Sequence, residues 1–141
     1  MPEGTVLAFD FGTLRIGVAV GEGLLGQARA LTTIDSPAND TRFAAIARLI
    51  AEWQPARLVV GLPRALDGTE HEMTARSRRF AHQLEGRFRL PVELVDERLT
   101  SAEAESTLRA AGRATRNDKA LVDAEAARVI LQNWFEHATA A

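Results

Sequence analysis

The amino-acid sequence predicts one α/β domain with a mixed sheet of about five strands and helices on both faces of the sheet. Two observations carry this prediction. Three short apolar segments follow one another near the N-terminus with only brief turns between them, and the rest of the chain alternates helical and strand patterns. Connections that short require antiparallel neighbours, whereas strands separated by helices pair in parallel. The 141 residues suit a single core, so we expect one domain over 1–141.

The first three strands are predicted from apolar runs and turn residues. Residues 5–11 (TVLAFDF) read as a buried strand, and residues 15–20 follow after Gly12-Thr13-Leu14, which predicts a hairpin. Gly21-Glu22-Gly23 turns the chain again, and residues 28–34 complete an antiparallel meander.

The later elements are expected in the order helix, strand, helix, strand, helix, helix, over residues 39–53, 58–62, 69–85, 91–95, 100–111 and 118–137. In the first of these helices, the pattern places Arg42, Arg48 and Glu52 on the solvent side. Thr69 and Glu72 fit a capping box at the start of the second helix. This order is that of the ribonuclease H-like architecture, although other α/β layouts also fit it.

Composition restricts the function classes. The chain has no cysteine, which excludes a disulfide scaffold and thiolate metal sites. No apolar run approaches the roughly 18 residues of a membrane span, and the N-terminus does not resemble a signal peptide, so we expect a cytoplasmic protein. The net charge of −2 excludes a general polyanion binder, yet only one of the 17 basic residues, Lys119, is not arginine. Arginine suits phosphate contacts, although a solvated helix face gives the same pattern.

Asp10 is a carboxylate where the strand pattern calls for an apolar side chain, because it lies in phase with Val6 and Ala8. A buried carboxylate is costly unless it is paired, protonated or bound to a metal. The alternative is a structural role, in which Asp10 accepts backbone N–H bonds from the Gly12-Thr13 turn.

Glu97 and Asp123 are the other two acids in unusual positions. Glu97 follows the last predicted strand, and ligands of α/β sheets collect at the carboxyl ends of strands. Its neighbour Asp96 faces the opposite way, so one of the two has a structural role. Asp123 lies on the buried stripe of the last helix, four residues before Ala127. An ion pair with Lys119 one turn earlier contributes only a few tenths of a kcal/mol, which favours a functional role for Asp123.

Three carboxylates that converge at one edge of a sheet form a hard oxygen site, which suits Mg²⁺ or Mn²⁺. Two such ions about 4 Å apart activate a water molecule and stabilise the leaving oxygen of a phosphodiester. No competing ligand set is evident, because His71, His82 and His137 are scattered over helices. Arg113 and Arg116, in or beside the polar loop over residues 112–117, and the following Lys119 are candidates for gripping a nucleic-acid backbone.

Four segments resemble the YqgF family, whose members are described as Holliday junction resolvases or pre-16S rRNA nucleases. The segments are DFGTLRIGVAV at 10–20, VVGLPRALDGTE at 59–70, LPVELVDERLTSAEA at 90–104 and KALVDAEAARVILQ at 119–132. Each is weak alone, but together they cover essentially the whole chain in order. The likeness is therefore specific.

The resemblance implies a ribonuclease H-like fold of the RuvC type and nucleic-acid cleavage that depends on a divalent metal. It implies that the catalytic and metal-binding acids are Asp10, Glu97 and Asp123. Family motifs also include four candidates for substrate contacts, Arg15, Arg98, Thr100 and Lys119. Leu14 departs from the pattern, since a lysine is common there, and this weakens one phosphate contact near the site.

Four functions remain open at this point. The leading hypothesis is a nuclease that trims the 5′ end of a ribosomal RNA precursor. Its partner would be nucleic acid and not a membrane, and it would act as a monomer or weak homodimer. A Holliday junction resolvase acting on structured DNA needs a two-fold dimer, and the family's acidic set is one carboxylate shorter than that of such resolvases. DFGT after a strand also resembles the phosphate-binding hairpin of actin-like ATPases and sugar kinases, but those proteins have two such domains and far longer chains. A non-catalytic nucleic-acid-binding module is the fourth alternative.

Overall fold

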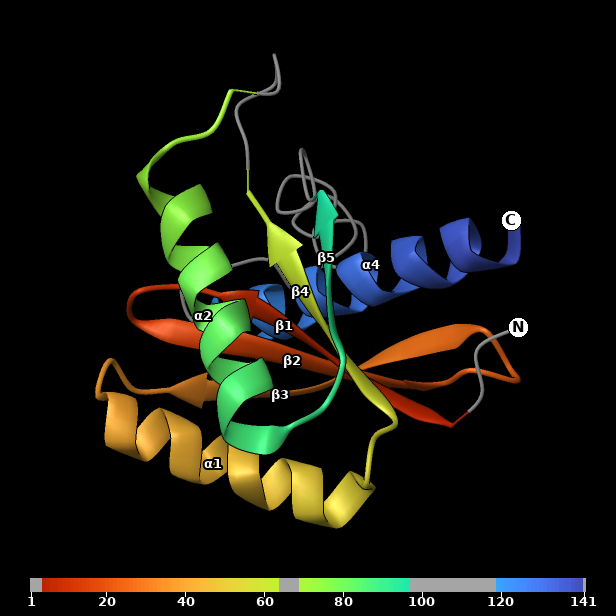
Figure 1. Cartoon of the computed structure of the whole chain (residues 1–141), viewed down its shortest axis with the longest axis horizontal. Helices are drawn as coiled ribbons and strands as arrows, with labels where there is room; N and C mark the ends of the chain where they lie inside the picture. The colour runs from red at the N-terminus through yellow and green to blue at the C-terminus, as the bar shows by residue number, and fades with distance from the viewer. Residues whose placement is uncertain (1–3, 64–68, 97–118, 141) are drawn as a thin grey trace.

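The computed structural model describes residues 4–63, 69–96 and 119–140, with the side chains of 119, 120 and 138–140 left out. Five strands form one sheet in the order β3-β2-β1-β4-β5. Helices α1 and α2 cover one face of this sheet, and α4 covers the other (Figure 1). Within the described part of the chain, no helix has the length and apolar character needed to cross a membrane.

The strands and helices lie within three residues of their predicted bounds. The strands are β1 Thr5–Phe11, β2 Arg15–Glu22, β3 Gln27–Asp35, β4 Arg57–Leu62 and β5 Val92–Asp96. The helices are α1 Asn39–Trp53, α2 Glu72–Phe88 and α4 Lys119–Ala140. The strand pairs β1–β2 and β2–β3 are antiparallel, whereas β1–β4 and β4–β5 are parallel, which confirms the predicted meander followed by parallel strands. The helix predicted over 100–111 and the loop over 112–117 lie outside the described residues.

Alternation along β1 sends side chains into two apolar layers. Leu7 and Phe9 pack with α1 and α2, whereas Val6 and Ala8 pack with α4. Successive side chains of a strand point to opposite faces, so this one strand anchors both layers. The carboxyl end of β1 is therefore held from both sides, and Asp10 lies at that end.

Two glycines of β2 allow α4 to lie directly on the sheet. A Cβ at Gly17 would overlap the backbone carbonyl oxygen of Asp123, and a Cβ at Gly21 would lie 2.6 Å from the ring of Phe135. Any side chain at these two positions would push the helix away from the strand. The lack of a side chain at Gly17 thus sets the position of the N-terminal part of α4, which carries Asp123.

Two local predictions are wrong. Arg42 is only 3% exposed and not on the solvent side of α1. Its guanidinium finds partly buried acceptors in two loops, the carbonyls of Gly12 and Ser36, which the helical pattern does not show. The cap of α2 is also not formed by Thr69 and Glu72: the N-cap is His71, whose side chain accepts from the Met73 N–H while its own N–H donates to Thr74.

Candidate active site

Asp10 and Asp123 share one face of the sheet. Asp10 lies directly opposite Gly17 in the antiparallel β1–β2 pair. Residues opposite each other in such a pair have side chains on the same face. The missing Cβ of Gly17 points at the backbone of Asp123, so this is the face covered by α4. The first strand and the last helix, far apart in sequence, thus bring two predicted site acids to one edge of the sheet.

Both carboxylates are partly accessible to solvent. Asp10 is half-buried, and the side chain of Asp123 is 25% exposed. Ala127 and Ile130, which follow Asp123 on the same helical stripe, are fully buried. The apolar layer between α4 and the sheet therefore stops at the edge where Asp10 and Asp123 lie. A ligand from solvent can reach both carboxylates there.

Arg15 forms an ion pair with Asp123. Its Nε donates to Oδ2 of Asp123 at 2.6 Å, and the side chain of Arg15 is 26% exposed. This hydrogen bond and the negative charge of Asp123 raise the pKa of Arg15 above its ordinary value, with a further contribution from Asp35. Arg15 therefore stays protonated at neutral pH, and it places a fixed positive charge beside Asp123.

The carboxyl end of β5 lies at the same edge of the sheet as that of β1, because β1, β4 and β5 run parallel. Asp96 lies opposite Leu62 of β4 and is exposed. Its neighbour Val95 packs against the α4 layer, so Asp96 points to the opposite face. Asp96 is consequently not a partner of Asp10 and Asp123. Glu97, the predicted third acid, lies outside the described residues.

Most of the predicted substrate contacts also fall outside the description. These are Arg98, Thr100, Arg113 and Arg116. Lys119 begins α4, but only its backbone is described, whereas Arg15 is described in full and contacts Asp123. Among the residues that the structure covers, no group of three potential ligands from His, Cys, Asp and Glu comes together. The three-carboxylate site thus stays a prediction, and its donor set fits Mg²⁺ or Mn²⁺ by its hard oxygen chemistry.

Arg42 is a site residue that the sequence reasoning missed. Its Nη2 donates to the carbonyl of Gly12 at 2.7 Å, in the turn that joins β1 to β2. The signal was present, because Arg42 lies four residues before Ile46 and so falls on the buried stripe of α1. Arg42 holds the turn that follows Asp10 from the face of the sheet opposite α4.

A family model described as RuvX, Holliday junction resolvase, matches residues 4–137. The chain belongs to this family. A relative from Methylobacillus flagellatus, named "Putative pre-16S rRNA nuclease", is 61% identical over 142 aligned positions, which cover 96% of this chain and 97% of the relative. Proteins of the same name from Dechloromonas aromatica and Chromobacterium violaceum are 59% and 60% identical, over 94% and 92% of this chain and 91% and 96% of the respective relatives. These matches confirm the family resemblance found in the sequence.

Solved structures confirm the fold. The structure is similar to Thermus thermophilus RuvC in complex with a Holliday junction substrate, with a TM-score of 0.62 and 17% identity over 99% of this chain and 98% of that chain. A second Thermus thermophilus RuvC structure gives a TM-score of 0.55 and 18% identity over 96% of both chains. At these identities the likeness concerns the fold alone, and it agrees with the predicted ribonuclease H-like architecture.

Proposed function

We propose that this protein is a divalent-metal-dependent nuclease that processes the 5′ end of pre-16S rRNA, with residues 1–141 acting as one domain. The observation that carries the proposal is the shared face of Asp10 and Asp123 at the sheet edge. The names of the relatives that are about 60% identical support the substrate. Such a substrate places the protein in the cytoplasm.

Asp10, Glu97 and Asp123 would hold Mg²⁺ or Mn²⁺ through carboxylate oxygens. When bound, these ions supply the positive charge that favours attack of water on phosphorus and departure of the leaving oxygen. The pairing of Asp10 with Gly17 and the contact of Gly17 with α4 fix the two described carboxylates relative to each other. Arg15 orients Asp123 through their ion pair, and its partly exposed guanidinium is available to a phosphate oxygen.

The test is cleavage of a 5′-extended 16S rRNA precursor fragment by the purified protein with Mg²⁺ or Mn²⁺, and with EDTA. Asp10→Asn and Asp123→Asn are expected to reduce cleavage by at least a hundredfold, because each removes a charged ligand. Asp96→Asn is the matched control, since this carboxylate ends β5 at the same edge of the sheet but points to the opposite face. Unchanged cleavage by Asp10→Asn would overturn the proposal.

Holliday junction cleavage is the second candidate, and the description of the matching family model favours it. It predicts paired nicks in a DNA four-way junction and a two-fold dimer, whereas RNA processing needs only a monomer or weak homodimer. The DNA four-way junction is therefore tested as a second substrate in the same cleavage assay. Specific binding without cleavage of either substrate would favour a non-catalytic nucleic-acid-binding module.

A further inference from the structure

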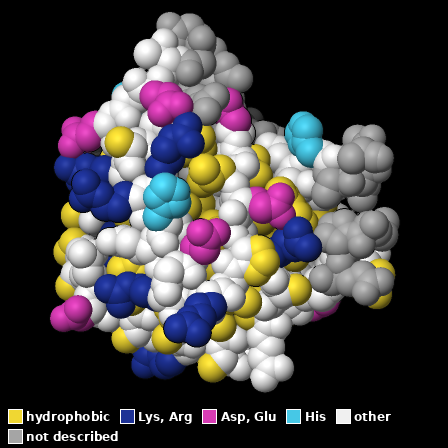
Figure 2. Space-filling view, viewed as in Figure 1, with side chains coloured by type: hydrophobic (Ala, Val, Ile, Leu, Met, Phe, Trp, Pro, Cys, Tyr) yellow, Lys and Arg dark blue, Asp and Glu magenta, His cyan; other side chains and the backbone are white. Residues whose placement is uncertain are grey.

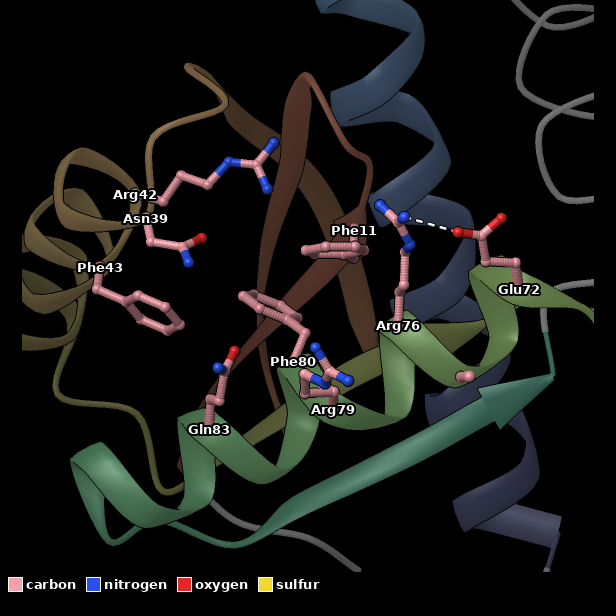
Figure 3. A pocket seen from close by; sticks show the side chains of 10 residues that line it. Phe11, Asn39, Arg42, Phe43, Glu72, Arg76, Arg79, Phe80 and Gln83 are labelled. Atoms are coloured by element: carbon pink, nitrogen blue, oxygen red, sulfur yellow. Dashed lines mark hydrogen bonds and ion pairs between the residues drawn. The ribbon is translucent and has the colours of Figure 1, made fainter.

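A cavity of about 530 Å³ lies on the face of the sheet opposite α4, between α1, α2 and the carboxyl end of β1. Its lining includes Phe11, Asn39, Arg42, Arg76, Arg79 and Gln83. Figure 3 shows Arg42 reaching from α1, and Arg76 rising from α2, on either side of Phe11. Figure 2 shows basic side chains spread over this side of the molecule. We call this cavity the arginine pocket.

The arginine pocket has an excess of positive charge. Three arginines line it, against one carboxylate, that of Glu72, which pairs with Arg76 at 2.6 Å. Arg79 is exposed and makes no ion pair with any residue that the structure describes. Two of the three guanidinium charges thus have no carboxylate partner among the described residues. An anion of matching size is the ligand that this lining favours.

The positive charge of Arg42 is held in place by burial and by hydrogen bonds to the backbone. It is 3% exposed, and its recorded hydrogen-bond partners are the carbonyl oxygens of Gly12 and Ser36. Its guanidinium also lies 5.4 Å from the centre of the Phe11 ring. Burial lowers the pKa of Arg42, and no acid in the described ranges compensates for it, yet arginine remains charged at neutral pH. A buried charge without a counter-charge is costly, and an anion in the pocket would offset that cost.

The pocket and the candidate active site lie on two sides of one strand end. Asp10 faces α4, and the next residue, Phe11, faces the pocket. The hydrogen bond from Arg42 to the carbonyl of Gly12 links the pocket wall to the turn after Asp10. Contacts on two sides of one strand end call for a ligand with more than one phosphate, which a polymer provides and a single small anion does not.

We propose that the arginine pocket binds a backbone phosphate of the substrate strand, next to the phosphate that is cleaved at Asp10 and Asp123. This inference rests on the proposed nuclease function and deepens it. Phosphate contacts of this kind fix the register of the strand without reading its sequence. Arg76 and Arg79 of α2 would thus contact substrate in addition to solvent.

The test is equilibrium binding of a fluorescein-labelled single-stranded RNA in EDTA, at several salt concentrations. Arg79→Ala is expected to weaken binding several-fold and to reduce the slope of log K against log salt by about 0.7, the value for one lost phosphate contact on a single strand. Arg48→Ala is the matched control, because it removes an exposed arginine of α1 that lies outside the pocket. Thermal unfolding of each variant verifies that it is folded.

Glu72→Gln is expected to change RNA affinity in the opposite direction. It removes the one carboxylate in the described pocket lining, so RNA binding is expected to strengthen two- to threefold. Glu85→Gln, an exposed position of the same helix outside the lining, is its control. Both variants remove one negative charge, so the proposal requires that RNA affinity rises for Glu72→Gln and stays unchanged for Glu85→Gln.

The proposal is overturned if Arg79→Ala binds RNA as Arg48→Ala does and Glu72→Gln binds as Glu85→Gln does. It is also overturned if inorganic phosphate or a mononucleotide binds tightly in an Arg79-dependent manner while RNA binding is unchanged. Binding is measured in EDTA, which prevents cleavage, so the pocket is tested by the binding data and the nuclease function by the separate cleavage assay. An Arg79 effect without any cleavage would retain the pocket and reject the nuclease, whereas cleavage without an Arg79 effect would do the reverse.

Discussion

Nε of Arg15 lies 2.6 Å from Oδ2 of Asp123, a residue 108 positions later in the chain. Arg15 is therefore not simply a free contact for substrate. It already neutralises one of the acids proposed to hold a metal ion, and it comes from the same hairpin as Asp10. A cation and the Arg15 guanidinium thus compete for the charge of Asp123.

Arg15→Gln is expected to raise the affinity for Mn²⁺ roughly fivefold, which corresponds to about 1 kcal/mol for one like charge removed at close range. Free Mn²⁺ measured by electron paramagnetic resonance in a titration gives this value without any cleavage assay. The same variant should lose cleavage activity, since the guanidinium beside the site is gone. Weaker Mn²⁺ binding by Arg15→Gln would show that Arg15 supports the metal site and does not compete with it.

Metal binding should also appear as added stability. Mn²⁺ at about a hundred times its dissociation constant is expected to stabilise the folded protein by about 2.7 kcal/mol, because it binds the native state alone. Thermal unfolding with Mn²⁺ and with EDTA measures this difference. Asp10→Asn should abolish it and Asp96→Asn should keep it, so an equal metal-dependent shift in both variants would place the ion elsewhere.

Gly17→Ala tests how closely α4 must approach the sheet. A Cβ at this position would overlap the carbonyl oxygen of Asp123, and the three nearest atoms all belong to the backbone of α4, which a side-chain rotation cannot move. Overpacking of this kind costs roughly 1–3 kcal/mol, and displacement of α4 should also abolish cleavage. Urea unfolding measures the loss of stability.

Gly86→Ala is the control for that substitution. Gly86 lies in α2 with open space around its Cβ direction, so alanine should stabilise the helix by up to about 1 kcal/mol. If Gly17→Ala were as well tolerated as Gly86→Ala, the close contact between β2 and α4 would not define the site.

The sequence allowed the sheet and the positions of two site acids to be predicted, because both follow from local patterns. Alternation within β1 indicated that Asp10 lies in phase with Val6 and Ala8, and the helical spacing placed Asp123 on the stripe of Ala127. The register of β1 with β2, which sets Asp10 opposite Gly17, then follows from the short hairpin.

The partners of the charged residues could not be predicted in the same way. For Asp123 the sequence offered an ion pair with Lys119 as the alternative to a functional role, and the side chain of Lys119 lies outside the described part of the chain. No sequence pattern indicated Arg15, the partner of Asp123 that the structure describes, which the packing of α4 on Gly17 brings near. Thr69 and Glu72 matched a capping motif, yet the N-cap of α2 is His71. The hydroxyl of Thr74 accepts from the backbone N–H of His71 and donates to the carbonyl of Pro63. Such contacts depend on loops whose path a periodic pattern does not contain.

Arg42→Lys tests whether the buried guanidinium holds the turn after Asp10. A single ammonium cannot reach both carbonyls in the geometry that Nε and Nη2 provide for Ser36 and Gly12. Leaving one partly buried carbonyl without its donor should cost about 1 kcal/mol in urea unfolding, the lower end of the range for buried groups. Hydrogen exchange at residues 11–15 should become faster, with Arg48→Lys on the exposed side of α1 unchanged. Loss of global stability with unaltered exchange at this turn would mean that Arg42 supports α1 alone, and that the pocket wall is not coupled to the active-site edge.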